Sequence, residues 1–134
     1  MEKVLAVTLL AAASFAAAAA TPAELQQRFE GEARAAGGAF AGFSAQRGEA
    51  FFKSAHGGDW SCASCHTQNP LAVGKHAGTG KRIAPLAPSA NAERFTDARA
   101  VDKWFRRNCN DVLGRECTAQ EKGDVLAWLM SLGG

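Results

Sequence analysis

The sequence lacks the features of several large classes of protein. Its 134 residues carry a formal net charge of only +2, and most of the basic residues are scattered, although Arg106-Arg107 is a clustered pair. A charge pattern of this kind argues against nucleic-acid binding. No sustained alternation of apolar and polar residues favours strands, and no internal repeat is found. The prediction is an all-α protein.

The sequence also has no apolar run long enough to be a membrane anchor. A lone cation at Lys3 precedes a short apolar segment and an alanine tract that ends at Ala20. The segment falls short of the ~20 residues that a spanning helix needs, whereas this order of features is typical of a secretory signal peptide. We expect a cleaved signal peptide over residues 1–20, a periplasmic location without stable membrane insertion, and one mature domain over residues 21–134.

Four segments have the periodicity and the end signals of helices. The first runs from Thr21-Pro22 to Gly37-Gly38 and the second from near Ser44 to Gly57-Gly58. The third runs from Thr96 to about Asn108 and the fourth from Thr118 to Gly133-Gly134. Threonine followed by proline is a favourable helix start, and a threonine with glutamate three residues later forms a capping box. Gly48, three residues before Phe51, would let another helix approach closely.

A long connection separates the second and third predicted helices. Residues 67–91 are rich in Gly, Pro, Ser and Asn. A loop of this length is too long for an idle connection in a small domain, and long loops of this kind are usually functional.

Cysteine is scarce, and two of the four cysteines stand in a specific motif. Cys62 and Cys65 are followed directly by His66, and C-x-x-C-H is the signature of haem attachment, in which both thiols add to the vinyl groups and the histidine binds iron. A zinc site would need four Cys or His ligands, and His56 and His76 lack paired ligand spacing. A thioredoxin-like dithiol would need alternating strands and helices. The motif predicts one covalent haem c, with the long loop wrapped around its edge.

The sixth iron ligand decides the function of such a protein, because a strong permanent ligand favours electron transfer and a weak one leaves room for a gas. Methionine is nearly absent: after the initiator only Met130 remains, in the apolar register of the last helix, where we expect a buried core residue. His76 in the long loop is a second candidate. His56 lies too close to the motif to reach the opposite haem face.

Asn108 is a third candidate. It shares one helix face with Val101, Trp104 and Phe105. A buried amide without a partner costs about 1 to 3 kcal/mol, and a haem iron would be a partner. The alternative is that Asn108 caps the C-terminal end of its helix. Spacing alone leaves both interpretations open.

Several stretches together carry a resemblance to a known family. They are Cys62-Ala63-Ser64-Cys65-His66, residues 79–89, Arg94-Phe95-Thr96-Asp97, and Asn108-Cys109-Asn110 with Gly114 and Cys117. On these residues the mature chain resembles the class I cytochromes c of the sphaeroides haem protein group, which are related to cytochrome c″. The resemblance implies the class I cytochrome c fold, with about four helices and long loops around one covalently bound haem.

The resemblance also implies a ligand and a disulfide. An asparagine matching Asn108 ligates the ferric iron and leaves on reduction, which frees a site for O2, NO or CO; cytochrome c″ has a histidine there. A disulfide matches Cys109 and Cys117, the two cysteines that haem does not use.

Broader similarity to class I cytochromes c implies two further contacts. Pro85 offers its carbonyl to the second ring nitrogen of His66, and Leu86 packs on the haem. Contacts of the first kind fix the tautomer and basicity of a ligating histidine.

The family resemblance favours electron transfer with a redox partner, such as a dihaem cytochrome c, together with binding of small diatomic molecules. A haem enzyme, such as a nitric oxide dioxygenase or a peroxidase-like reductase, is the alternative. No general acid or base stands out beside the site, since His76 is the one free histidine with a route to it. A third possibility is a permanently six-coordinate electron shuttle, which would bind no gas.

Overall fold

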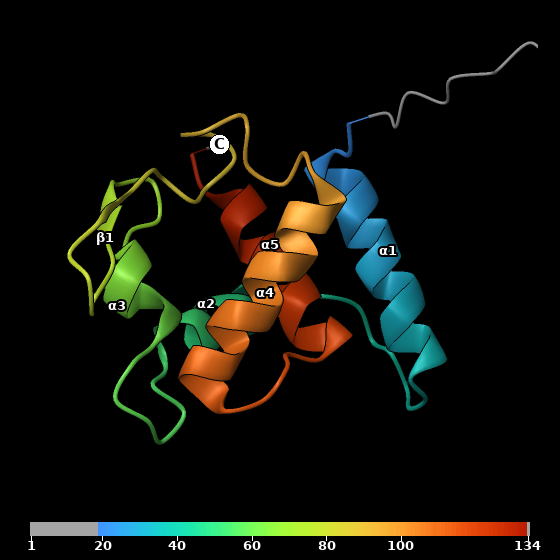
Figure 1. Ribbon diagram of the computed structural model, residues 1–134. Helices are drawn as coiled ribbons and strands as arrows, with labels where there is room; N and C mark the ends of the chain where they lie inside the picture. The colour runs from blue at the N-terminus through green and yellow to red at the C-terminus, as the bar shows by residue number, and fades with distance from the viewer. Residues whose placement is uncertain (1–18, 134) are drawn as a thin grey trace, which may run out of the picture.

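The computed structural model describes residues 19–133 (Figure 1). In chain order its elements are α1 (Pro22–Ala35), α2 (Ala45–Lys53), α3 (Cys62–His66), β1 (Gly74–Lys75), β2 (Arg82–Ile83), α4 (Ala98–Leu113) and α5 (Ala119–Ser131). The all-α fold is therefore confirmed. The predicted signal peptide lies outside the described residues except for Ala19 and Ala20. Within residues 19–133 no helix is both long and apolar enough to cross a membrane.

Helix starts follow the predicted capping signals at both ends of the chain. The Thr21 hydroxyl accepts from the Glu24 backbone N–H, and the Glu24 carboxylate accepts from the Thr21 backbone N–H at 2.8 Å. Thr118 and Glu121 form the same reciprocal pair at the start of α5. Each box satisfies donors that a helix otherwise leaves unpaired. The second helix begins near Ser44 as predicted, with Ser44 as its N-cap, although it ends at Lys53, before the predicted glycines.

The predicted bounds of α4 are wrong at both ends. Asp97, not Thr96, is its N-cap and accepts from two backbone N–H groups, whereas the Thr96 hydroxyl donates to the Glu93 carbonyl. The helix runs past Asn108 to Leu113 and ends at Gly114, whose φ of 69° is left-handed. A glycine in this conformation is a common helix end. Asn108 is therefore interior to α4, and the interpretation of its amide as a helix cap is wrong.

Periodicity missed the smallest elements. α3 is a single turn that carries the C-x-x-C-H motif, and Ser61 and Ser64 form a capping box at its start. β1 and β2 are two-residue antiparallel strands within the long loop, paired as Gly74 with Ile83 and Lys75 with Arg82. Elements this short cannot complete a hydrophobic period, so the sequence pattern holds no signal for them.

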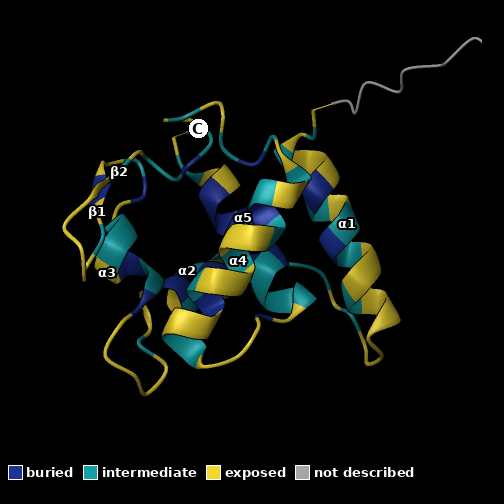
Figure 2. Cartoon of the chain, in the orientation of Figure 1, coloured by how far each residue is buried: buried dark blue, intermediate teal, exposed yellow. Residues whose placement is uncertain are grey.

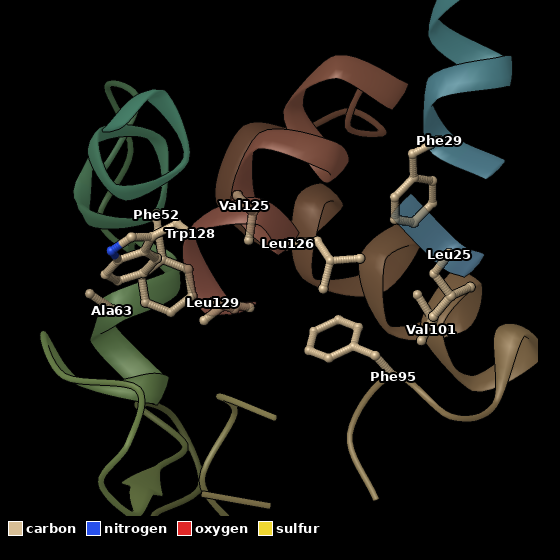
Figure 3. Packing of buried hydrophobic residues seen from close by; sticks show 10 residues of the cluster. All are labelled: Leu25, Phe29, Phe52, Ala63, Phe95, Val101, Val125, Leu126, Trp128 and Leu129. Carbon is tan, nitrogen blue, oxygen red and sulfur yellow. The ribbon is translucent and has the colours of Figure 1, made fainter. Parts of the chain in front are cut away.

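The core is built around α5, which lies at the centre of Figure 1 and packs on α1 and α2. Gly48 of α2 faces the backbone of Asp124, and a Cβ atom on it would overlap the Asp124 carbonyl. Nearby, the rings of Phe52 and Trp128 lie 5.0 Å apart between centroids (Figure 3). The close approach of another helix, which Gly48 predicts, is therefore confirmed, and that helix is α5.

One predicted core residue is on the surface. Met130 is 43% exposed. The buried face of this last turn of α5 is formed by Trp128 and Leu129 instead. The interpretation of Met130 as a core residue is therefore wrong.

α4 presents an exposed outer face in Figure 2, and two side-chain contacts join it to α1. The Phe29 and Phe105 rings meet edge to face at 5.9 Å. The Arg28 guanidinium donates to both carboxylate oxygens of Asp102, at 2.8 and 2.6 Å. This hydrogen-bonded pair lowers the pKa of Asp102 below its ordinary value. Apolar packing and a bidentate ion pair thus fix α4 against α1.

Candidate haem site

A cavity of about 680 Å³ opens between α3, the β1–β2 hairpin, the following loop and α4. Its size is within the range of cofactor sites. Five of the six residues predicted to contact the haem line it, and they come from separate parts of the chain: Cys62, Cys65, His66, Leu86 and Asn108. The fold therefore brings the attachment motif and the candidate sixth ligand to one space. His66 belongs to α3 and Asn108 to α4, and both helices are labelled in Figure 1.

The attachment motif is held by its neighbours. The single turn of α3 places Cys62 and Cys65 one turn apart, with His66 at its end. Gly74 of the hairpin lies so close that a Cβ atom on it would overlap the Cys65 carbonyl. The Ala77 backbone N–H also donates to the Cys65 sulfur at 3.3 Å. The hairpin therefore fixes one edge of the cavity.

The motif is buried enough to change its acid–base properties. Burial raises the pKa of Cys62 to about 11, and the neighbouring Cys65 adds to this. Burial, with a smaller contribution from the Arg94 cation, lowers the pKa of His66 to about 4. His66 is therefore a neutral imidazole at physiological pH, the form that ligates metals. Its Nδ1 is buried without a hydrogen-bond partner among residues 19–133.

Asn108 lies on a continuous strip of α4 that faces the cavity. Val101, Trp104 and Phe105 line the cavity with it, as the helical spacing predicts. Among the described residues, the Asn108 amide makes no side-chain hydrogen bond, whereas the exposed Asn110 donates its Nδ2 to the Arg106 carbonyl at 2.9 Å. The side-chain amide of Asn108 thus lies at the cavity wall, within the length of the helix and without a protein partner. Such a group can serve as a ligand or a hydrogen-bonding group for a bound molecule.

The two other histidines are engaged in local hydrogen bonds. His76 lines the cavity, but its Nδ1 accepts from the backbone N–H groups of Gly78 and Thr79, each at 3.1 Å. The proton of a neutral His76 ring is then on Nε2, which leaves no free lone pair for iron. His56 packs on the Phe51 ring and bonds the Phe51 carbonyl through Nε2 at 2.8 Å. The geometry argues against both as sixth ligands.

The predicted hydrogen bond from His66 to the Pro85 carbonyl is not formed in the structure. That carbonyl accepts instead from Arg94 Nε at 2.9 Å and from Asn91 Nδ2 at 3.3 Å. The loop folds back so that these two side chains occupy both lone pairs of the oxygen. The neighbouring Leu86 does line the cavity.

The structure joins Cys109 to Cys117 by a disulfide, with Cα atoms 5.6 Å apart. Both residues are buried and both line the cavity. The bridge ties α4 beside Asn108 to the residue before the N-cap of α5. It therefore restrains the part of α4 that carries the candidate ligand.

Sequence reasoning missed two residues at the cavity. Phe95 is buried there with a φ of 61°, a left-handed conformation that is unfavourable for a bulky residue. Arg94 lines the cavity beside it. Both belong to a stretch that carries part of the family resemblance, and no periodicity or spacing signals a single residue in an unusual backbone conformation.

The chain was compared with known proteins. Residues 38–129 match a family described as a domain of unknown function (DUF1924). The cytochrome c-type protein SHP of Cereibacter sphaeroides is 49% identical over 113 residues, covering 81% of this chain and 82% of that protein. Cytochrome c″ of Methylophilus methylotrophus is 49% identical over 80 residues, covering 60% of this chain and 56% of its own length.

Solved structures of the same two proteins are similar in fold. The structure of oxidised SHP, an oxygen binding cytochrome c, has a TM-score of 0.72 at 44% identity and covers 83% of this chain and 96% of that one. Oxidised cytochrome c″ from Methylophilus methylotrophus also has a TM-score of 0.72, at 39% identity, covering 82% and 93%.

The C-x-x-C-H turn, the cavity that it lines and these similarities define a class I c-type cytochrome with one covalently bound haem c and its iron. Within that class, the chain belongs to the SHP and cytochrome c″ family.

Proposed function

We propose that this protein is a periplasmic electron-transfer cytochrome in which Asn108 is a redox-dependent sixth ligand, so that the reduced form binds O2, NO or CO. Cys62 and Cys65 hold the haem, His66 is the proximal ligand and Leu86 packs on the haem. The mature domain spans residues 21–134. One observation carries the proposal: Asn108 lies within α4 and lines the cavity, and its side-chain amide has no hydrogen-bond partner among residues 19–133.

The chemistry of the amide supports reversible ligation. Its neutral oxygen is a hard donor that suits ferric iron and binds the softer ferrous iron poorly. The haem iron supplies the change of oxidation state and the affinity for a diatomic molecule. Asn108 then exchanges with an incoming ligand instead of remaining bound in both states.

The structure around Asn108 supports a side-chain movement over a movement of the helix. The Arg28–Asp102 pair ties α4 to α1, and the Cys109–Cys117 disulfide ties it to the start of α5. With the backbone held at both places, rotation of the short asparagine side chain is the smallest change that opens the site.

The relatives support the same proposal. SHP is described as an oxygen binding cytochrome c. A solution structure of cytochrome c″, with a TM-score of 0.70 at 39% identity, concerns the structural basis of haem-ligand detachment. The function that we propose combines both properties: Asn108 leaves the iron, and a small molecule binds in its place.

The proposed partner is a redox protein, such as a dihaem cytochrome c. Apart from the proposed iron ligand His66, the described residues place no histidine at the cavity that is free to act as a general base, because the Nδ1 of His76 is engaged by two backbone N–H groups. This favours electron transfer and ligand binding over an enzyme such as a nitric oxide dioxygenase.

An absorption titration of the reduced protein with carbon monoxide tests the proposal. Saturable binding with a shift of the haem bands is expected, because the amide leaves the ferrous iron. A reduced protein that binds no carbon monoxide would instead be a permanently six-coordinate shuttle. Sustained consumption of nitric oxide by the reduced, oxygenated protein would favour the enzyme.

A further inference from the structure

The β1–β2 hairpin places two cations directly opposite each other. Lys75 and Arg82 are partners in its antiparallel register, and both residues are exposed. Partners in register lie on the same face of the ladder, and like charges in this arrangement are destabilising. Each strand has only two residues, so the ladder itself gains little to offset this cost. The pair is therefore unfavourable for the isolated protein, and an anionic group bound to this face would compensate it.

The segment around the hairpin contains no acidic residue. Between residues 60 and 92 the chain has neither aspartate nor glutamate, and its lysine and arginine residues are Lys75, Lys81 and Arg82. All three are exposed, and none forms a salt bridge with any residue from 19 to 133. The acidic residues that line the haem cavity belong to later segments of the chain: Glu93, Asp97 and Asp111. The hairpin therefore presents charge of one sign.

A large apolar side chain adjoins these cations. Trp60 is 36% exposed, and its ring meets the ring of His76, the residue after Lys75, edge to face at 6.1 Å between centroids. Gly78, in the turn of the hairpin, also lies against this ring, since a Cβ atom on it would be 3.4 Å from Trp60. Exposed tryptophan beside arginine is typical of the energetic centre of a protein interface. We call Trp60 and the three cations of the hairpin the hairpin surface.

The hairpin surface lies beside the edge of the cavity where the haem is attached. The Ala77 backbone N–H donates to the Cys65 sulfur at 3.3 Å, and Figure 2 shows the hairpin next to α3 at one edge of the molecule. Trp60 also lines the cavity. A protein docked on this surface would therefore lie close to the thioether bonds of the haem. Opposite charges on two proteins raise the rate of their encounter without requiring tight binding.

We propose that the hairpin surface docks an acidic face of the redox partner. The reduced centre of the partner gives up one electron, and the ferric iron takes it up and becomes ferrous. The three cations pair with carboxylates of the partner, and Trp60 packs at the middle of the contact. A lipid surface is the poorer fit, because three cations are fewer than the about four to eight of a polybasic lipid site. This inference rests on the electron-transfer function proposed above.

Stopped-flow reduction of the ferric holoprotein by reduced flavodoxin, an acidic protein donor, tests the docking. Lys75→Glu is the main variant, because Lys75 is exposed and does not line the haem cavity. Its second-order rate constant should be about tenfold lower than that of wild type at low ionic strength. The difference should disappear at about 1 M salt, where charges are screened within about 3 Å. Lys75→Glu should also unfold at a higher denaturant concentration than wild type, because it places opposite charges across the ladder.

Arg99→Glu is the matched control, since it makes the same change of net charge at an exposed position of α4 that does not line the cavity. Its rate constant should stay within about twofold of wild type. Equal losses in both variants, or an unchanged rate in Lys75→Glu, would overturn the proposal. So would wild-type reduction that is independent of salt, together with sedimentation of the protein with phosphatidylglycerol vesicles, which would assign the hairpin to a lipid surface.

A small donor separates this docking from the proposed function. Reduction by the uncharged semiquinone of lumiflavin should be equally fast in wild type and Lys75→Glu, because it needs no docking of charged surfaces. A slower reaction of Lys75→Glu with lumiflavin would show that the substitution acts on the haem and would overturn the proposal. A haem that no donor reduces would overturn the electron-transfer function and the docking with it. Carbon monoxide binding by the reduced protein reports separately on Asn108.

Discussion

The disulfide between Cys109 and Cys117 begins one residue after Asn108 and ends one residue before the N-cap of α5. The candidate ligand and the bridge are therefore adjacent on α4. Replacing both cysteines by serine is expected to destabilise the holoprotein by about 2 to 3 kcal/mol, because the bridge closes a short loop. Guanidinium unfolding of wild type and variant measures this difference.

Thiol counting tests the bridge itself. Denatured wild-type holoprotein should contain no titratable thiol, since haem uses Cys62 and Cys65 and the disulfide uses the other two cysteines. Two free thiols in freshly exported protein would show that the bridge does not form.

Covalent attachment of the haem gives a second prediction. Acid–acetone should leave the haem on the wild-type protein, and Cys62→Ala should sharply lower the yield of holoprotein, because one of the two thioether bonds is lost. Absorbance of the extracted and protein fractions measures this. Complete extraction from wild type would contradict the attachment.

The helix crossing at Gly48 gives a third prediction with an internal control. Gly48→Ala should destabilise the protein by about 1 to 3 kcal/mol, because its methyl group would overlap the backbone of Asp124 and force α2 away from α5. Gly31→Ala, in α1 with no atom within 4 Å of the added carbon, should stabilise by about 0.5 to 1 kcal/mol through helix propensity. Equal effects of the two substitutions in denaturant unfolding would contradict the close crossing.

The ion pair between α1 and α4 gives a fourth prediction. The hydrogen-bonded Arg28 lowers the pKa of Asp102 in the folded protein below its ordinary value of 3.8. The ion pair therefore stabilises the folded state above pH 3.8, and this contribution is lost as the pH falls through the pKa of Asp102 in the folded protein. Asp102→Asn should therefore cost up to about 1 kcal/mol at neutral pH, a small value because both side chains are partly exposed. The difference from wild type should vanish in acid. A pH-independent difference in unfolding free energy would point to packing instead.

The sequence predicts the parts of this fold that have local signals. The capping boxes at Thr21 and Thr118 mark true helix starts, and the short C-x-x-C-H motif marks the haem. The sequence prediction ends α4 too early because Asn108 is compatible with either a helix end or a helix interior, whereas the helix ends at the left-handed Gly114.

Contacts between distant segments were the hardest to predict. The Pro85 carbonyl accepts from Asn91 and Arg94 because the loop turns back on itself, and the next residue, Phe95, has a left-handed conformation. No spacing rule contains that information. The exposure of Met130 likewise depends on which neighbours cover the last turn of α5.

The most direct test of the central claim is the rate at which azide binds the ferric holoprotein. Asn108→Ala should bind azide about tenfold faster or more, which corresponds to removing a competing interaction of about 1.4 kcal/mol, and its ferric spectrum should change. Asn108→His should instead give a low-spin ferric spectrum. The control is Asn110→Ala, which removes an exposed amide from the same helix and should match wild type. If Asn108→Ala has the azide binding rate and ferric spectrum of wild type, Asn108 is not the sixth ligand and the account is wrong.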